Sequence, residues 1–513
     1  MIGFDKAFGK FNVNAFFGGN RMRNSSETIA ANGNGFNVPF FAAINNAQQR
    51  NFGYGFSEYG INSIFASAEV SYNNYLFLTA TWRRDWFSVL NPSINNIDYP
   101  SIGAAFAFTD ALSGLPSWLS FGKVRASWAQ VGNANSVGAY ATNPTFSLGN
   151  PHLSRPLATY SSAGGNNGTL PNPGLIPYTS TEIEFGLDVR LFQNRVGLDI
   201  AYYSQKTTDD ILAAGISRAS GFGFTSVNVG EITNKGIEFL LTGTPVKGDL
   251  TWNVSLNFAK NNNKVESLIE GQDRLFVEEP RTRTAAVYQM VGQPFGMILG
   301  LRQMTSPDGQ LVYDADGAPL TDNTYQILGN GVADFTGGLN NELLFKQFSL
   351  SFLIDFKSGG DIYSGTNVRM TQSGYTQRTL QGREGEAPLV VTGVTDSDGD
   401  GNYEPFTKTL TPGEAQNYWS QLGDRAQENF MYDASFIKLR QLTFGYSFPK
   451  SMLSKTPIQT LSLSFVGRNL AILFKNVDNI DPEAGYSSSN AQGLDYFGMP
   501  ATRSYGFNLR ATF

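Results

Sequence analysis

The chain ends in Arg503-Ser504-Tyr505-Gly506-Phe507-Asn508-Leu509-Arg510-Ala511-Thr512-Phe513. From Tyr505 onward every second residue is apolar or aromatic, and most residues between them are polar or charged. A period of two is typical of a β-strand that has one face in apolar surroundings. A strand of a membrane β-barrel meets this condition, because neighbours pair with it and lipid covers its outer face. The last strand of a soluble β-sandwich is the alternative from this stretch alone.

The composition of the 513-residue chain favours a turn-rich β protein with much aromatic surface. Aromatic residues make up 13%, including 40 Phe and 22 Tyr. Charged residues make up 16%, compared with roughly 25% in ordinary soluble proteins. The 55 Gly residues and the Asn clusters at 73–74 and 261–263 indicate many turns. Because no linker or block of charge divides the chain, we expect one large unit.

Several classes of protein are excluded by composition. The sequence has no run of 18 apolar residues, so it is not a helical membrane protein. It has no Cys, and its net charge of -6 gives no basic surface for nucleic acid. His152 is the only histidine, so the residues needed for a Ser–His hydrolase or for a hydrolytic metal site built on several histidines are missing. Glu182 and Glu184 alternate with apolar residues, which favours the polar lining of a barrel over acid–base work, and we expect no catalysis.

Alternating stretches recur in pairs and predict β-hairpins. The clearest pair joins residues 64–72 to 76–82 across the turn Asn73-Asn74. The other pairs lie at residues 182–203, 237–258, 335–356 and 437–468, with a looser one that joins 102–108 to 124–128. With residues 11–17 and the terminal stretch this gives about 14 strands, each near the roughly 9–11 residues of a tilted membrane strand.

Long connections alternate with the short turns. They are predicted at residues 18–62, 132–180, 261–333, 358–432 and 469–502. In an up-and-down barrel every second connection lies on the same rim, whereas a soluble sandwich has little reason to sort its loops in this way. The predicted fold is therefore all-β, a transmembrane antiparallel up-and-down β-barrel with long extracellular loops and short periplasmic turns.

Short motifs in these strands and loops point to a family. They are Asn234-Lys235-Gly236-Ile237-Glu238-Phe239, Gly243-Thr244-Pro245-Val246, Trp252-Asn253-Val254, Asp334-Phe335-Thr336-Gly337-Gly338-Leu339-Asn340-Asn341, Gly359-Gly360-Asp361-Ile362-Tyr363-Ser364 and Gly467-Arg468-Asn469-Leu470. The closing motifs are Asp481-Pro482-Glu483, Asn490-Ala491-Gln492-Gly493, Met499-Pro500 and Thr502-Arg503-Ser504-Tyr505-Gly506-Phe507. Together they resemble the SusC/RagA family of TonB-linked (TonB-dependent) outer-membrane transporters, over the chain from about Phe16 to Phe513.

This resemblance implies a barrel of roughly 22 strands, of which residues 1–513 supply the C-terminal part as one partial barrel domain. A plug domain, a TonB box, a signal peptide and the first strands are then expected outside the given sequence. The resemblance further implies a location in the bacterial outer membrane, in contact with membrane lipid. It implies import of oligosaccharides or peptides, with a SusD-like surface lipoprotein as lid and with energy from the TonB–ExbB–ExbD complex, which acts through the missing N-terminal part. Two alternatives stay open: a self-contained passive porin of about 14 strands, and a surface adhesin or structural β protein.

One acidic stretch has the spacing of a calcium loop. Its candidate ligands are Asp396, Asp398, Asp400, Asn402 and Glu404. They match the oxygen positions of the first part of an EF-hand loop, with Gly401 at the place of the sharp turn. Thr407 stands where the loop needs a bidentate Glu, so a solvated acidic turn is the alternative. We expect no other cofactor.

Aromatic residues fall into two groups. Those near strand ends are expected at the membrane interface: Trp82, Trp128, Tyr202 and Trp252. Those in the long connections are candidates for contact with the substrate or the lid: Tyr418, Trp419, Tyr486, Tyr496 and Phe497.

Overall fold

The structure is a computed structural model that describes residues 1–134, 136–139, 141–143, 146–148, 158–160, 168–282, 284–396, 399, 401–488 and 491–513. Its largest sheet has fifteen strands, whose order in the sheet follows the order of the chain. They are β1 (Ile2–Phe8), β2 (Phe11–Phe36), β3 (Ala47–Tyr72), β4 (Leu76–Phe87), β5 (Asn96–Ala107), β6 (Leu119–Asn133), β10 (Tyr178–Leu191), β11 (Val196–Thr208), β14 (Glu231–Val246), β15 (Leu250–Ser267), β20 (Phe335–Phe345), β21 (Phe348–Ser358), β26 (Phe436–Ser447), β27 (Thr460–Lys475) and β29 (Ser504–Thr512). The prediction of an all-β protein with a large antiparallel sheet is confirmed.

Short turns join the strands where the sequence predicted hairpins. Between β3 and β4, Asn73 and Asn74 have φ values of 48° and 61°, a left-handed conformation that Asn tolerates better than most residues. The sequence predicted about 14 strands in this sheet. The strand that it missed is β1, which pairs with β2 from Ile2 opposite Phe17 to Phe8 opposite Phe11.

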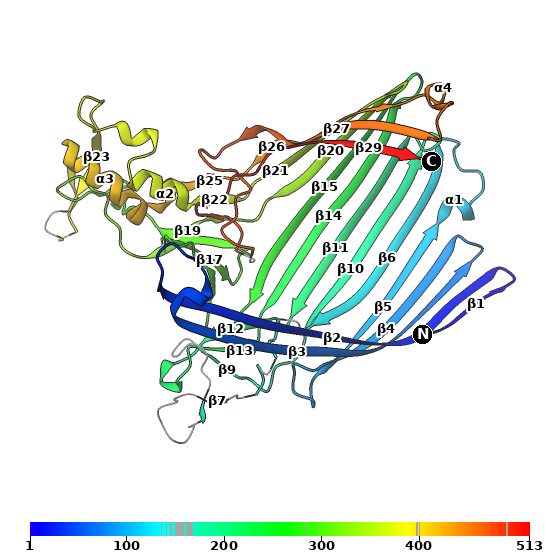
Figure 1. The fold of residues 1–513 in the computed structure, drawn as a ribbon, viewed down its shortest axis with the longest axis horizontal. Coiled ribbons are helices and arrows are strands. Elements are labelled where there is room, and N and C mark those ends of the chain that lie inside the picture. Colours follow the sequence, from blue (N-terminus) through cyan, green and yellow to red (C-terminus); the bar gives the residue numbers. More distant parts are fainter. Residues whose placement is uncertain are drawn as a thin grey trace. The chain divides into compact units, whose positions relative to one another are not determined.

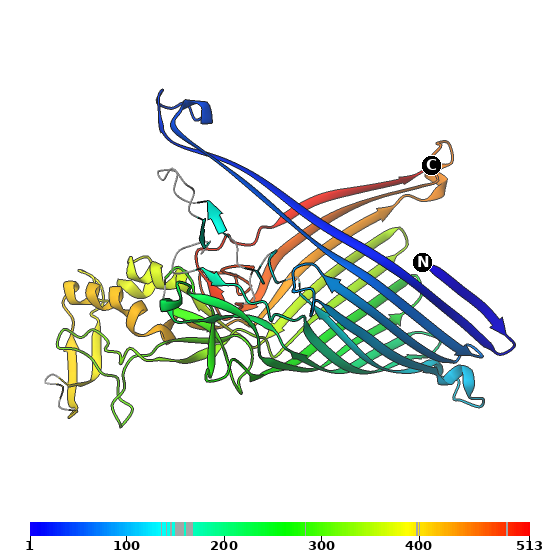
Figure 2. The same ribbon diagram turned by 90° about the horizontal axis from the view of Figure 1, so that it is seen from below.

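The prediction of a long connection at residues 18–62 is wrong. Strand β2 continues to Phe36 and β3 begins at Ala47, and the two pair along almost their whole length. Figure 2 shows this hairpin, in dark blue, projecting beyond the ends of β4 and β5. Backbone hydrogen bonds between two strands do not require an apolar face, and the mostly polar sequence of distal β2 concealed the hairpin, although Phe52, Tyr54 and Phe56 alternate with glycine on β3.

The chain forms two compact units. The first consists of Met1–Ala111, Val124–Phe185 and Gln205–Ile232. Besides strands of the large sheet it contains β7 (Phe146–Leu148), β8 (Ala158–Tyr160), β9 (Thr169–Leu170), β12 (Ile211–Gly215), β13 (Phe224–Asn228), α1 (Phe108–Ala111), η1 (Ile44–Asn46) and η3 (Arg218–Ser220). Its apolar core packs Phe87, Val89 and Leu90 against Leu175.

The second unit consists of Leu112–Lys123, Gly186–Ser204 and Thr233–Phe513. Its long connections, residues 268–334, 359–435 and 476–503, are called the loop layer below. The loop layer contains β16 (Arg274–Glu278), β17 (Ala285–Met290), β18 (Met297–Leu301), β19 (Tyr325–Asn330), β22 (Asp361–Ser364), β23 (Val390–Thr395), β24 (Glu404–Thr409), β25 (Met431–Asp433), β28 (Leu494–Asp495), α2 (Gly365–Gln372), α3 (Pro412–Arg425), η4 (Gln377–Leu380) and η5 (Gln427–Phe430). A short helix, α4 (Lys450–Leu453), lies in the opposite connection. Figure 1 shows α2, α3 and β23 beyond one end of β20 and β21.

Apolar side chains are buried in the loop layer and exposed on the sheet. Tyr363, Val368 and Phe430 have no exposed surface. On β29, by contrast, Tyr505, Phe507 and Leu509 are 65–79% exposed. A continuous apolar face of this kind is unfavourable in water and indicates an apolar environment. Among the described residues, no helix has both the length and the apolar character needed to cross a membrane.

Candidate functional site

The loop layer begins just after β21. Gly359 and Gly360, at φ values of 73° and 77°, interrupt the strand before β22 continues in the same direction, and a side chain would strain this left-handed backbone. Ser364 then caps α2 by accepting a hydrogen bond from the amide of Asn367 at 3.1 Å. Its own hydroxyl donates to Asp495 Oδ2 at 2.9 Å, which ties α2 to β28.

Helix α3 packs beside α2 and starts with a capping box. Thr411 Oγ1 accepts from the amide of Glu414, and Glu414 Oε2 accepts from the amide of Thr411 at 2.9 Å. Lys408 Nζ lies 2.8 Å from Glu414 Oε1. The hydrogen bond from Lys408 and those from Thr411 lower the pKa of Glu414 to about 2. A capped start and a buried face at Ala415 and Leu422 explain why this sequence forms a stable helix.

A cavity of about 780 Å³ lies between these segments. Most of its lining side chains are polar, and five of them are amides. The lining residues are Asn367, Thr376, Gln377, Arg378, Leu380, Gln381, Glu386, Ala387, Asn429, Tyr432, Asp478 and Asn479. Amide groups both donate and accept hydrogen bonds, so the cavity suits a neutral polar ligand rather than a covalent reaction.

Two larger side chains of this cavity are fixed by the fold. Arg378 donates to Thr371 Oγ1 through Nε and Nη2 at 3.3 and 3.1 Å, and its guanidinium carbon lies 4.4 Å from the centre of the Phe430 ring. Burial lowers the pKa of Arg378 and raises the pKa of Tyr432. Sequence reasoning missed both residues, because neither belongs to a recognisable motif.

Of the predicted contact residues, Tyr418 and Trp419 lie in α3 and pack into the apolar clusters of the loop layer. Burial raises the pKa of Tyr418 to about 12. Trp419 Nε1 donates to the carbonyl oxygen of Gln381 at 3.1 Å, and Trp419 also lines a second cavity of about 360 Å³. Neither Tyr418 nor Trp419 is among the described residues that line the cavity of about 780 Å³.

The other three predicted contact residues are in contact through their rings. The rings of Tyr486 and Tyr496 are 6.3 Å apart, and those of Tyr496 and Phe497 are 5.0 Å apart. Phe497 is the most exposed of the three, at 58%. Tyr486 also packs against the apolar cluster that Tyr418 and Trp419 contact, so Phe497 is the exposed candidate of the five. A role in binding stays a prediction.

An ion-pair cluster joins the loop layer to β26. Lys438 Nζ lies 2.5 Å from Asp481 Oδ1 and 2.5 Å from Glu483 Oε2. Arg440 donates to Asp355 Oδ2 at 2.6 Å and also to Glu483. Burial of Glu483 opposes its ionisation, but the hydrogen bonds from Arg440 and Lys438 outweigh this effect and lower the pKa of Glu483. The motif that contains Asp481 and Glu483 thus anchors its loop to the strand.

The acidic stretch proposed for calcium is only partly described. Asp396 accepts hydrogen bonds from the amides of Gly399 and Gly401 at 2.9 and 3.2 Å, and Glu404 opens β24 opposite Thr395. Asn402 is described, whereas Asp398 and Asp400 lie outside the described residues. Calcium binding therefore stays a prediction.

Of the residues considered for catalysis, Glu184 has a basic partner. Arg125 Nε lies 3.2 Å from Glu184 Oε1, so Glu184 belongs to an ion pair. His152 lies outside the described residues. Within the described ranges, no three His, Cys, Asp or Glu side chains gather as a metal site would require.

Comparison with known proteins agrees with this architecture. Residues 3–355 match the family model for the TonB dependent receptor-like β-barrel. The chain is 27% identical to TonB-dependent receptor P3 of Formosa agariphila, over 99% of this chain and 51% of that protein. It is 24% identical to TonB-dependent receptor SusC of Bacteroides thetaiotaomicron, over 86% of this chain and 42% of SusC.

A solved structure shows the same fold. The structure of the RagAB peptide transporter covers all of this chain with a TM-score of 0.76 and 20% identity, and this chain covers 54% of the matched one. The chain thus spans about half the length of the relatives that it matches. These relatives are receptors and transporters rather than enzymes. The chain belongs to the TonB-dependent receptor-like β-barrel family, is an outer-membrane protein, and is similar to SusC and to the RagAB transporter.

Proposed function

We propose that this chain forms the barrel part of a SusC-like transporter that imports oligosaccharides or peptides across the outer membrane. The observation that carries the proposal is the loop layer, which holds an amide-lined cavity of about 780 Å³ at one end of a large antiparallel sheet. Loops on a rigid sheet are where such proteins build recognition. Family membership supports transport over the two alternatives that the sequence left open.

The chemistry of the cavity limits the substrate class. Its amides, together with Arg378 and Tyr432, offer hydrogen bonds to sugar hydroxyls and to peptide groups alike. Only two of its lining residues, Leu380 and Ala387, have apolar side chains. A solute that donates and accepts hydrogen bonds therefore fits, and both oligosaccharides and peptides remain candidates.

The proposal includes the rest of the transporter. In the family resemblance, the fifteen strands found here are part of a barrel of roughly 22 strands that surrounds a plug domain. A SusD-like lipoprotein is proposed to cover the loop layer, and the TonB–ExbB–ExbD complex is proposed to supply energy through the plug-bearing part. The names of SusC and of the RagAB peptide transporter support this assembly by analogy.

The test is to isolate the protein from outer membranes in mild detergent and to identify the polypeptides that accompany it by mass spectrometry. We expect a SusD-like lipoprotein and a plug-bearing segment. A chain that purifies without either and forms conducting pores in a planar bilayer would instead be a passive channel. A chain that leaves the membrane without detergent would favour the adhesin.

A further inference from the structure

One face of strands β2 to β5 is apolar, beginning at the strand ends that the short turns connect. Its large side chains are 37–58% exposed, and they are Phe11, Phe17, Val70, Leu78 and Ile102. The other face of the same strands carries polar groups such as Glu69, Arg83 and Asp85. In an outer-membrane β-barrel protein, the apolar face is the one that contacts lipid.

Arg21 stands where this apolar band ends. It lies on the same face of β2 as Phe11 and ten residues further along the strand. Ten residues extend roughly 34 Å along a strand, or roughly 26 Å along the membrane normal at a tilt of about 40°. Because the apolar band of such proteins is about 25 Å tall, Arg21 is placed at the level of the lipid headgroups.

One tryptophan marks the same level. On this face Trp86 is paired opposite Asn62, which in turn faces Arg21, whereas Trp82 is paired through Ala66 with Phe17, four residues nearer the short turns. Tryptophan is enriched at membrane–water interfaces, where its ring lies among the headgroups. The short turns lie at the other end of the band. The end of the band that carries Arg21 and Trp86 therefore faces the outer leaflet, because long loops are extracellular in such barrels.

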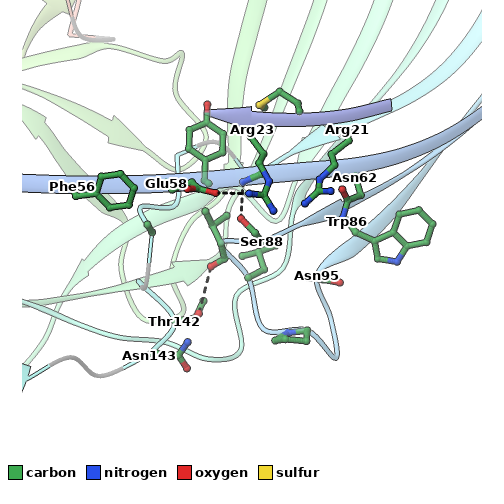
Figure 3. Close-up of a pocket in the computed structure, with 17 residues that line it drawn as sticks. Arg21, Arg23, Phe56, Glu58, Asn62, Trp86, Ser88, Asn95, Thr142 and Asn143 are labelled. Atoms are coloured by element: carbon green, nitrogen blue, oxygen red, sulfur yellow. Dashed lines mark hydrogen bonds and ion pairs between the residues drawn. The ribbon is translucent and has the colours of Figure 1, made fainter. Parts of the chain in front are cut away.

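A pocket of about 660 Å³ opens beside Arg21. Figure 3 shows Arg21 and Arg23 extending from β2 toward Asn62 and Ser88, with Trp86 at one side. Asn95 and Asn143 add amide groups to the lining, and the exposed Phe56 and Pro92 add apolar surface. A cation beside amides and apolar side chains suits a ligand that has both an anionic head and an apolar part.

The charges in this region leave one cation without a counterion. Arg84 binds Asp98 through Nε and Nη2 at 2.8 and 2.6 Å, and Arg23 lies 3.2 Å from Glu58. Among the described residues, no carboxylate pairs with Arg21, which is exposed. An unpaired guanidinium at a membrane interface is stabilised by an anion, and its planar fork matches phosphate.

We infer that Arg21 and its pocket bind the phosphate of an outer-leaflet lipid. The guanidinium of Arg21 holds the phosphate, Asn62 and Asn95 offer hydrogen bonds to the remaining polar headgroup, and Trp86 packs at the boundary with the acyl chains. A solute that passes along the polar face of the sheet does not meet Arg21, because Arg21 lies on the opposite face. The inference requires the outer-membrane location but not any particular transported substrate.

The test uses the full chain purified in mild detergent, with bisphosphorylated lipid A as the probe and its dephosphorylated form as the comparison. Native mass spectrometry counts the lipids that stay bound. We expect the phosphorylated lipid to remain at one copy per chain and the variant Arg21→Gln to retain about tenfold less. Arg50→Gln is the matched control, because Arg50 lies on the same face of β3 but near the hairpin tip, opposite Gly33.

Three results would overturn the inference. The first is equal retention of lipid A by the native chain and by Arg21→Gln, provided that both migrate as folded on a heat-modifiability gel. The second is equal binding of the dephosphorylated lipid, which would indicate acyl-chain contacts alone. The third is complete displacement of lipid A by excess inorganic phosphate, which would indicate a site for free anions.

Discussion

Lys438 Nζ lies 2.5 Å from Asp481 Oδ1, although only 5% of the Lys438 side chain is exposed. The same ammonium group pairs with Glu483, which also accepts from Arg440. A nearly buried lysine is stable only when it is paired and hydrogen-bonded. The cluster therefore fixes the position of the loop that carries Asp481 and Glu483 on the end of β26.

Replacing Lys438 by Met is expected to lower the free energy of unfolding by roughly 2–3 kcal/mol, because it leaves two carboxylates without their counterion. The effect is smaller than for a fully buried pair, since the side chain of Glu483 is 36% exposed. Urea unfolding in lipid vesicles gives the value. Lys264→Met is the control, because Lys264 is 51% exposed beside Glu266 and should lose less than about 1 kcal/mol. Equal losses in both variants would contradict this account.

The same cluster predicts a pH dependence. The pKa of Glu483 in the folded protein is below its ordinary value of 4.5. Its ion pairs with Lys438 and Arg440, beside Asp481, thus stabilise the fold fully above about pH 4.5, and this stabilisation is lost as the pH falls through the lower folded pKa. Unfolding midpoints measured between pH 7 and pH 3 should fall more steeply for the native chain than for Glu483→Gln. Parallel curves would show that other groups control the acid response.

Calcium should bind weakly to residues 396–404 if the predicted loop forms. The loop lacks the bidentate Glu, since Thr407 occupies that position, so we expect a Kd of about 10⁻⁴–10⁻³ M. Isothermal titration with CaCl2 measures it, and Asp396→Asn should abolish the signal. Equal heats for the native chain and the variant would leave this stretch as a solvated turn.

The alternation of apolar and polar residues was sufficient to predict fourteen of the fifteen sheet strands. It missed β1, which has only seven residues. It also misassigned the distal parts of β2 and β3, where β2 is mostly polar and only Phe52, Tyr54 and Phe56 of β3 keep the alternation. The period of two reports an apolar environment on one face rather than strand conformation itself. A strand that lies outside the membrane therefore need not show this period over its whole length.

The loop layer was less predictable for a different reason. Its cavity brings together Asn367, Arg378, Asn429 and Asn479, which are far apart in the sequence and follow no period. The position of aromatic residues in the long connections was the available signal, and it led to Trp419, which supports the layer through Gln381 instead of lining the larger cavity. Contacts of this kind depend on how several connections pack together, and a single sequence does not encode them as a local pattern.

Trp419 and Phe497 should respond differently to alanine. Trp419→Ala removes packing in the loop layer and the hydrogen bond to Gln381, with a loss of roughly 2 kcal/mol for a half-buried ring. Phe497→Ala should change stability by less than about 0.5 kcal/mol, because Phe497 is 58% exposed, but should lower uptake. Proteolysis of the loops and uptake by cells distinguish the two effects. Unchanged uptake in Phe497→Ala would end its predicted role in contact with substrate or lid.

The amide-lined cavity gives the most direct test of the proposed import. Arg378→Gln should lower the apparent affinity of uptake about tenfold, because it removes a fixed donor from the cavity wall. Arg369→Gln is the matched control: Arg369 lies on α2, is exposed, and is not part of that wall. Asn429→Ala is a second cavity variant that should leave the fold intact, because Asn429 is exposed and, among the residues that the structure describes, its side chain donates to the carbonyl oxygen of Ala426 alone. If both cavity variants import as the native chain does, while Phe497→Ala does not, the substrate meets Phe497 rather than this cavity.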